Sequence, residues 1–121
     1  MKVKGFRWVG VGCQDLSAMR EFCTNVLGLS TLKESKNGSF VEFETESGQR
    51  FEVFGPRSSS YKLHQNPVLA FEVEDIDDAR LSLERAGIEI LTRTSKRAKE
   101  AYWFYFRAPD GFVYEVQQWN L

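Results

Sequence analysis

The sequence has few of the residues that common catalytic and redox motifs need. It contains one histidine, two cysteines and three prolines among 121 residues. Cys13 and Cys23 lack the spacing of a redox pair or a zinc knuckle, so we expect both to be small buried hydrophobic residues. His64 has no identifiable serine or cysteine partner for nucleophilic catalysis, and no glycine-rich phosphate-binding motif is present.

An excess of charge and long apolar runs are also missing. The formal net charge is −1 and the 16 Lys and Arg residues are dispersed, which argues against a nucleic-acid partner. The small basic cluster at residues 96–99 is expected to be a solvated loop. Residues 1–7 are basic but no long apolar run follows them, so we expect no secretory signal, no membrane partner and a cytoplasmic location.

What the chain does contain is ample material for a packed interior. Hydrophobic residues make up 42% of the sequence, including ten Phe, four Tyr and three Trp, and 27% of the residues are charged. A chain of this length and composition is typical of one compact, water-soluble domain.

The most informative feature is an internal repeat. Residues 9–28 return loosely about sixty positions later, as a strand-like run, an aspartate and a helix-like run that ends at glycine. The second halves of the two copies match at a constant offset of 63, which pairs Glu52 with Glu115. The chain therefore consists of two copies of one structural unit.

Apolar spacing predicts the same order of elements, βαβββ, in both copies. The expected strands cover residues 3–13, 31–34, 39–45, 49–54, 68–73, 88–93, 101–107 and 111–119. Asp15 and Asp75 are expected to cap the two helices, which should end at Gly28 and Gly87.

These elements define an α+β fold of two tandem modules within a single domain covering residues 1–121. The first βαβββ module is expected at residues 1–55 and the second at 67–121. Residues 56–66 combine a proline with small polar residues, and we interpret them as the linker.

The order of elements and several short strings resemble the vicinal oxygen chelate superfamily, which includes glyoxalase I, extradiol dioxygenases, methylmalonyl-CoA epimerase, and the bleomycin and fosfomycin resistance proteins. The matching strings are Val9-Gly-Val-Gly-Cys-Gln-Asp-Leu16 with Asn25-Val-Leu-Gly-Leu29, Leu69-Ala-Phe-Glu-Val-Glu-Asp-Ile76, and Phe104-Tyr-Phe-Arg-Ala-Pro-Asp-Gly111. Ala108 stands where the family usually has Asp, a departure that concerns the turn.

The resemblance implies a glyoxalase-like fold, in which two modules close a cupped mixed sheet around one small-molecule ligand with the helices outside. Two chains often exchange modules to do this, so a homodimer is expected. Metal-dependent members take their ligands from four symmetric positions. Those positions fall here on Trp8, Glu52, Val68 and Glu115.

Half of this implied ligand set cannot bind a metal ion, because Trp8 and Val68 offer no donor. Zinc sites use three or four protein ligands, and a non-haem iron oxygenase needs two histidines and a carboxylate. The single His64 is expected to be exposed in the linker, although a loop could carry it inward. We therefore expect no cofactor, with a divalent metal as the less favoured alternative.

The two-residue period of strands selects the side chains that would line the cup. Phe51 and Val53 should face the helices. Gly10 and Gly12 could clear space beneath Trp8 for a flat ligand, or they could equally mark close backbone packing. The candidate ligand-binding residues are Trp8, Gly10, Arg50, Glu52, Phe54, Val68, Trp103, Tyr105, Glu115 and Gln117.

The favoured function is metal-independent binding of a small aromatic or cationic molecule, similar to the bleomycin resistance branch. Trp8, Trp103 and Tyr105 would offer stacking faces, and Glu52 and Glu115 would offer counter-charges.

The alternative is a glyoxalase-type lyase or isomerase, with Glu52 or Glu115 as the catalytic proton-transfer base and Arg50 stabilising the developing charge. Two further readings stay open. The glutamates could line a solvated face without a task, or the protein could act through an interface with another protein.

Overall fold

The computed structural model describes residues 1–97 and 99–120, and its backbone forms two compact units. The N-terminal unit is Arg7–Val68, and the C-terminal unit combines Met1–Phe6 with Leu69–Leu121. The first six residues thus belong with the second half of the chain, where the ring of Phe6 lies 5.5 Å from that of Phe71.

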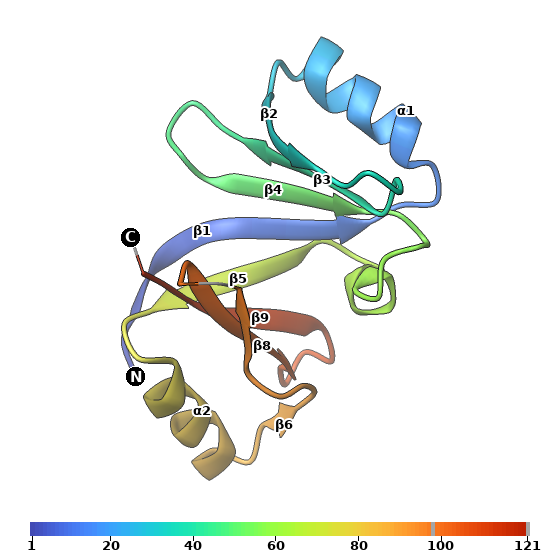
Figure 1. The fold of residues 1–121 in the computed structure, drawn as a ribbon. Coiled ribbons are helices and arrows are strands. Elements are labelled where there is room, and N and C mark those ends of the chain that lie inside the picture. The colour runs from blue at the N-terminus through green and yellow to red at the C-terminus, as the bar shows by residue number, and fades with distance from the viewer. Residues whose placement is uncertain (98, 121) are drawn as a thin grey trace. The chain divides into compact units, whose positions relative to one another are not determined.

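The N-terminal unit contains four neighbouring strands and one interrupted helix (Figure 1). The elements are β1 (Val3–Gly12, whose residues from 7 onward lie in this unit), α1 (Leu16–Glu21), the π-helix η1 (Phe22–Val26), β2 (Ser30–Glu34), β3 (Phe40–Glu44), β4 (Arg50–Phe54) and the 3-10 helix η2 (Tyr61–His64). The strand order is β2-β3-β4-β1, with β1 parallel to β4 and the other pairs antiparallel.

The first helix begins and ends where the sequence predicts. The Asp15 side chain accepts a hydrogen bond from the amide of Ala18, and Gly28 has a φ of 68° just after the helical segment. Its second part, η1, is a π-helix in place of the regular helix that the apolar spacing predicts.

One face of this sheet packs against the helix. The buried residues there are Cys23, Val41, Phe43 and Val53, with Phe51 and Met19 partly buried beside them. Burial raises the pKa of the Cys23 thiol, which agrees with its expected role as a packing residue. Because alternate strand residues point to opposite faces, the polar residues of β4 lie on the other face.

The C-terminal unit repeats the arrangement around a second helix. Its elements are β5 (Val68–Val73, of which residues from 69 onward lie in this unit), α2 (Ile76–Arg85), β6 (Glu89–Ile90), β7 (Ser95–Arg97), β8 (Ala101–Arg107) and β9 (Val113–Trp119). The strand order is β5-β9-β8-β6, and β7 also pairs with β8. Asp75 caps α2 by accepting from the amides of Asp77 and Asp78.

Two predictions about this unit are wrong. The strand expected at 88–93 is reduced to Glu89–Ile90, and the basic cluster expected to be a loop forms β7. The Lys96 ammonium lies 5.5 Å from the centre of the Tyr102 ring, a cation–π contact that helps this strand pair with β8. Residue 98 of the cluster lies outside the described residues.

The core of the C-terminal unit lies between α2 and one face of its sheet. The buried residues are Val73, Ile76, Ala79, Phe104, Phe106 and Val116. In the part of the chain that the structure describes, no helix is long and apolar enough to cross a membrane.

Candidate ligand-binding site

Strand register places several predicted site residues on one face of the N-terminal sheet. Trp8 is opposite Arg50, Gly10 opposite Glu52, and Gly12 opposite Phe54 in the parallel β1–β4 pair. These positions alternate with the core residues Val53 and Phe51, so they share the face that points away from α1. The predicted division between core and polar faces is confirmed here.

Trp8 and Glu52 are joined by a hydrogen bond. The indole Nε1 donates to Glu52 Oε1 over 3.1 Å, and the two residues are 4% and 8% exposed. An indole is a neutral donor, so this bond fixes the position of the carboxyl group without bringing a positive charge to it. In this structure Trp8 therefore acts as a positioning residue for Glu52.

Of the two interpretations of Gly10 and Gly12, the structure supports close packing within the protein and not space for a ligand. A Cβ at Gly10 would lie 2.1 Å from Cη2 of the Trp8 ring, and one at Gly12 would lie 2.8 Å from the backbone oxygen of His64. Both glycines allow close internal packing, which is the other common reason for glycine in a strand.

His64 is buried, contrary to the exposure predicted for it. It is 0% exposed, its ring centre lies 4.5 Å from that of Phe54 and 5.6 Å from that of Trp8, and Nδ1 lies 2.6 Å from the Ser60 carbonyl oxygen. Burial lowers the pKa of this imidazole, and the bond to Ser60 offsets that only partly. A carbonyl can only accept, so Nδ1 carries a proton in the neutral ring.

Glu42 is a buried acidic residue that the sequence-based prediction missed. It is directly opposite Glu52 in the β3–β4 pair and is 1% exposed. Arg50 Nη1 lies 3.8 Å from Glu42 Oε1, an ion pair that is too long for a hydrogen bond. The alternation of Glu42 with the core residues Val41 and Phe43 is the signal that could have identified it.

The C-terminal unit carries a second polar face. Glu115 is opposite Ala70 in β5 and Tyr105 in β8, and Gln117 is opposite Glu72 and Trp103. Phe104 and Phe106 lie in the core on the other face. The predicted orientation of β8, with Trp103 and Tyr105 beside Glu115, is confirmed.

Glu115 is held by a chain of neutral donors. Trp119 Nε1 donates to Gln117 Oε1 over 2.7 Å, and Gln117 Nε2 donates to Glu115 Oε1 over 3.0 Å. Glu115 is 2% exposed and Gln117 is 5% exposed. The paired glutamates of the repeat are thus both oriented by neutral N–H groups, directly from an indole in one unit and through an amide in the other.

The buried polar residues are predominantly acidic. They are Glu42, Glu52, His64, Glu72, Glu115 and Gln117, and no Lys or Arg side chain in the described ranges belongs to the buried class. Val68, the remaining predicted site residue, is apolar and 2% exposed.

The residues present do not fit the metal ion of the metal-dependent relatives. Trp8 and Val68 supply no lone pair, and the Trp8 N–H is directed at Glu52. Across residues 1–97 and 99–120, no three His, Cys, Asp or Glu side chains are placed so that they could hold a metal ion together.

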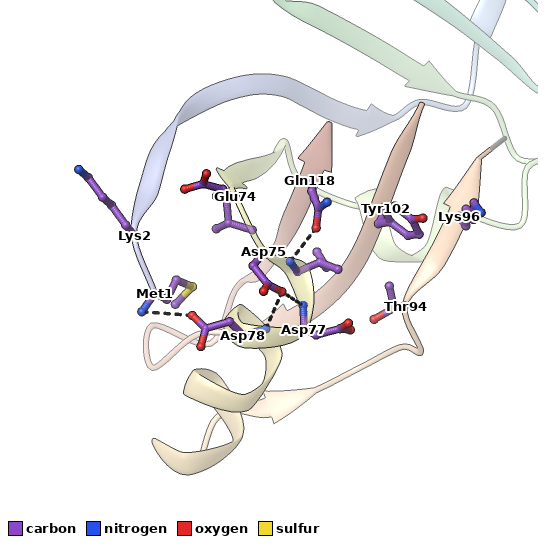
Figure 2. Close-up of a pocket in the computed structure, with 12 residues that line it drawn as sticks. Met1, Lys2, Glu74, Asp75, Asp77, Asp78, Thr94, Lys96, Tyr102 and Gln118 are labelled. Carbon is purple, nitrogen blue, oxygen red and sulfur yellow. Dashed lines mark hydrogen bonds and ion pairs between the residues drawn. The ribbon is translucent and has the colours of Figure 1, made fainter. Parts of the chain in front are cut away.

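A separate open pocket of about 1060 Å³ lies in the C-terminal unit where α2 begins (Figure 2). Two of its acidic side chains have partners within this unit: Asp75 accepts from two backbone amides of α2, and Asp78 lies 3.7 Å from the Met1 amino group. Gln118 Oε1 accepts from the Ile76 amide over 2.9 Å. None of the predicted site residues lines this pocket.

The repeated βαβββ units define a protein with the glyoxalase-like fold. The chain belongs to the Glyoxalase/Bleomycin resistance protein/Dioxygenase superfamily, whose family model matches residues 5–116. No curated protein matches the sequence.

Solved structures of low sequence identity share the fold. A hypothetical protein, BH1468 from Bacillus halodurans C-125, has a TM-score of 0.76 at 15% identity, with 97% of this chain and 95% of that chain covered. Methylmalonyl-CoA epimerase from Mycobacterium tuberculosis gives 0.73 at 18%, with coverages of 98% and 90%. A Mn(II)-bound glyoxalase from Novosphingobium aromaticivorans gives 0.74 at 23%, covering 97% of this chain and 39% of that one.

Proposed function

We propose that this protein binds a small organic cation with an aromatic group and needs no resident metal ion to do so. The observation that carries the proposal is the acidic character of the buried polar residues, four of which are glutamates. Glu52 and Glu115 accept hydrogen bonds from neutral N–H donors, and in their ionised form they would offer counter-charges to a cation. A cationic ligand would lower the electrostatic free energy of these groups.

Aromatic side chains accompany the glutamates on both polar faces. Phe54 is two residues after Glu52 on the same face of β4, and Tyr105 is opposite Glu115 in the β8–β9 pair. Trp103, one position further along the same face of β8, is only partly buried. Aromatic faces attract organic cations through the ring quadrupole, so rings and carboxylates favour the same class of ligand.

The same charges disfavour the alternative lyase or isomerase. Proton abstraction next to a carbonyl builds negative charge, which needs a positively charged or strongly polar donor. Arg50, the donor expected for this role, lies against Glu42. Binding is therefore better supported than proton transfer.

The proposed partner is a small molecule, and the homodimer implied by the family resemblance stays a prediction. Sedimentation equilibrium of the full chain at several concentrations measures it directly. A mass of one chain across the micromolar range would exclude a stable dimer.

Binding can be tested with three probes of nearly the same shape: 1-naphthylmethylammonium, 1-naphthylmethanol and 1-naphthoate. Isothermal titration calorimetry in EDTA should give the tightest binding for the cation and the weakest for the anion. Glu52→Gln and Glu115→Gln should each weaken the ammonium probe about tenfold, which corresponds to about 1.4 kcal/mol. The alcohol should change about twofold or less, because it forms no ion pair.

Glu46→Gln is the matched control, since it removes the same charge from an exposed turn outside both polar faces. It should leave all three affinities within about twofold, the small effect expected of a screened surface charge. Equal affinity for the cation and the alcohol would contradict the proposal. So would an equal response of the ammonium probe to Glu46→Gln and Glu52→Gln.

A further inference from the structure

Residues 58–66 of the N-terminal unit pack over the aromatic rings that flank Glu52. His64, at the end of η2, contacts the Phe54 ring with a centre-to-centre distance of 4.5 Å and the Trp8 ring at 5.6 Å. We propose that residues 58–66 form a strap that closes over Trp8 while His64 is neutral and opens when His64 is protonated. The strap would control access to Glu52, a role that rests on the proposed ligand binding.

The strap is built as a self-contained turn. Its backbone hydrogen bonds include Tyr61 N to Ser58 O at 3.2 Å and Leu63 N to Ser60 O at 3.1 Å. The side-chain amide Nε2 of Gln65 donates to Tyr61 O over 2.8 Å. These bonds can persist when the segment moves away from the sheet. The contacts that would be lost include the ring contacts of His64 and the close approach of Tyr61 to Gly12. No strand lies within residues 58–66, so opening need not break strand pairing.

Gly12 allows the strap to lie directly on β1. A Cβ at this position would be 2.8 Å from the His64 backbone oxygen and 3.1 Å from that of Tyr61. Backbone atoms of the strap cannot yield to such a methyl group by a rotamer change. An alanine at position 12 should therefore hold the strap away from the sheet even while His64 is neutral.

The groups around His64 disfavour a charged imidazole in the closed strap. The imidazole ring packs against two aromatic rings that do not titrate, Trp8 on β1 and Phe54 on β4. The ionisable groups on the same sheet face include Glu52 and, beyond it, Arg50 and Glu42. Within the strap they include the neutral Tyr61 phenol and the exposed Lys62 ammonium. Burial outweighs the bond to the Ser60 carbonyl oxygen and lowers the pKa of His64.

The sign of the pH dependence follows from this direction. In the closed strap the pKa of His64 lies below its ordinary value, and in the open strap it returns to about 6.5. The open form then binds protons more readily than the closed form, so lowering the pH favours opening. Closure is fully supported above about pH 6.5 and weakens as the pH falls through the lowered pKa.

Access to Glu52 would change with the strap. Trp8 and Glu52 are only 4% and 8% exposed with the strap in place. Lifting the strap uncovers the Trp8 ring, whose Nε1 holds the Glu52 carboxylate. The proposed cationic ligand should therefore associate faster in mild acid than at neutral pH.

The test needs no ligand and uses the full chain. His64 is the only histidine, so its imidazole NMR signals report one pKa without further assignment. A neutral gadolinium chelate, added between about pH 8 and pH 5, reports how accessible the Trp8 indole N–H is to solvent; Trp8→Phe assigns that signal. We expect His64 to titrate below about 6.5 and the paramagnetic relaxation of the Trp8 signal to rise severalfold with the same midpoint.

Two variants separate opening from protonation alone. His64→Phe keeps an aromatic ring against Phe54 and Trp8 but cannot titrate, so the relaxation of the Trp8 signal should stay low at both pH values. Gly12→Ala should raise it at neutral pH. The inference is overturned if His64 titrates while the relaxation of Trp8 stays constant, or if His64→Phe retains the pH dependence.

Ligand-binding kinetics test separately whether the strap controls access to Glu52. Stopped-flow mixing with 1-naphthylmethylammonium should show faster association at about pH 5.5 than at pH 8 in the wild type and no such difference in His64→Phe. If the strap opens but association does not accelerate, the access role is wrong while the proposed binding stands. If no affinity is measured at all, the proposed function fails, while the ligand-free result still decides whether the strap opens.

Discussion

The Gly10→Ala variant should lose about 3 kcal/mol of unfolding free energy, because a small residue in the strand makes room for a large buried one. The added Cβ would lie 2.1 Å from Cη2 and 2.7 Å from Cζ2 of the Trp8 indole. The ring is 4% exposed and has little free space to move into. Moving it would also break the bond from Nε1 to Glu52.

The size of this loss combines two effects. Overpacking of a core costs about 1–3 kcal/mol, and the loss of a hydrogen bond to a charged group costs about 1.5–3 kcal/mol. Urea denaturation followed by far-ultraviolet circular dichroism measures the sum. Ligand binding should weaken in the same variant, since Glu52 loses the donor that orients it.

A double-mutant cycle identifies the cause. Trp8→Leu removes the distal part of the indole, so Gly10→Ala should cost about 1 kcal/mol or less in that background, and the coupling free energy should exceed about 1.5 kcal/mol. Equal costs of Gly10→Ala in both backgrounds would show that the Trp8 ring is not what the new methyl group meets.

The sequence predicts most of the fold because the relevant signals are local. Caps at Asp15 and Asp75 depend on a side chain and an amide two or three residues away, and glycines after helices depend on one φ angle. The two-residue period of strands likewise assigns Glu52 and Glu115 to the face opposite the helices. Each of these rules needs only a short window of sequence.

The errors concern features that depend on distant parts of the chain. The sequence around His64 is polar and predicts exposure, but Phe54 and Trp8 provide an apolar surface onto which this loop folds. Glycine at position 10 indicates that room is needed beside the strand. The sequence does not tell whether a ligand or a neighbouring side chain occupies that room. Two-residue periodicity could have identified Glu42, whereas only the three-dimensional structure places Arg50 beside it.

Gln117→Leu should destabilise the protein by about 3 kcal/mol, because it removes the centre of the chain from Trp119 to Glu115. Leucine has a similar size but can neither accept from the Trp119 indole nor donate to the Glu115 carboxylate. Glu115 is 2% exposed, so water replaces the lost donor poorly. Gln14→Leu, at an exposed position, is the matched control and should change the unfolding free energy by about 0.5 kcal/mol or less.

Glu115→Gln shows whether the charge is responsible. In the Glu115→Gln background no carboxylate depends on the amide of residue 117, so Gln117→Leu should cost at least about 1 kcal/mol less than in the wild type. Equal costs would mean that Gln117 matters through packing or through Trp119 alone. In that case Glu115 would not be oriented by this chain, and its proposed role as a fixed counter-charge for a cationic ligand would lose its structural basis. A clear coupling would instead show that the C-terminal unit holds its glutamate with neutral donors, as Trp8 holds Glu52 in the N-terminal unit.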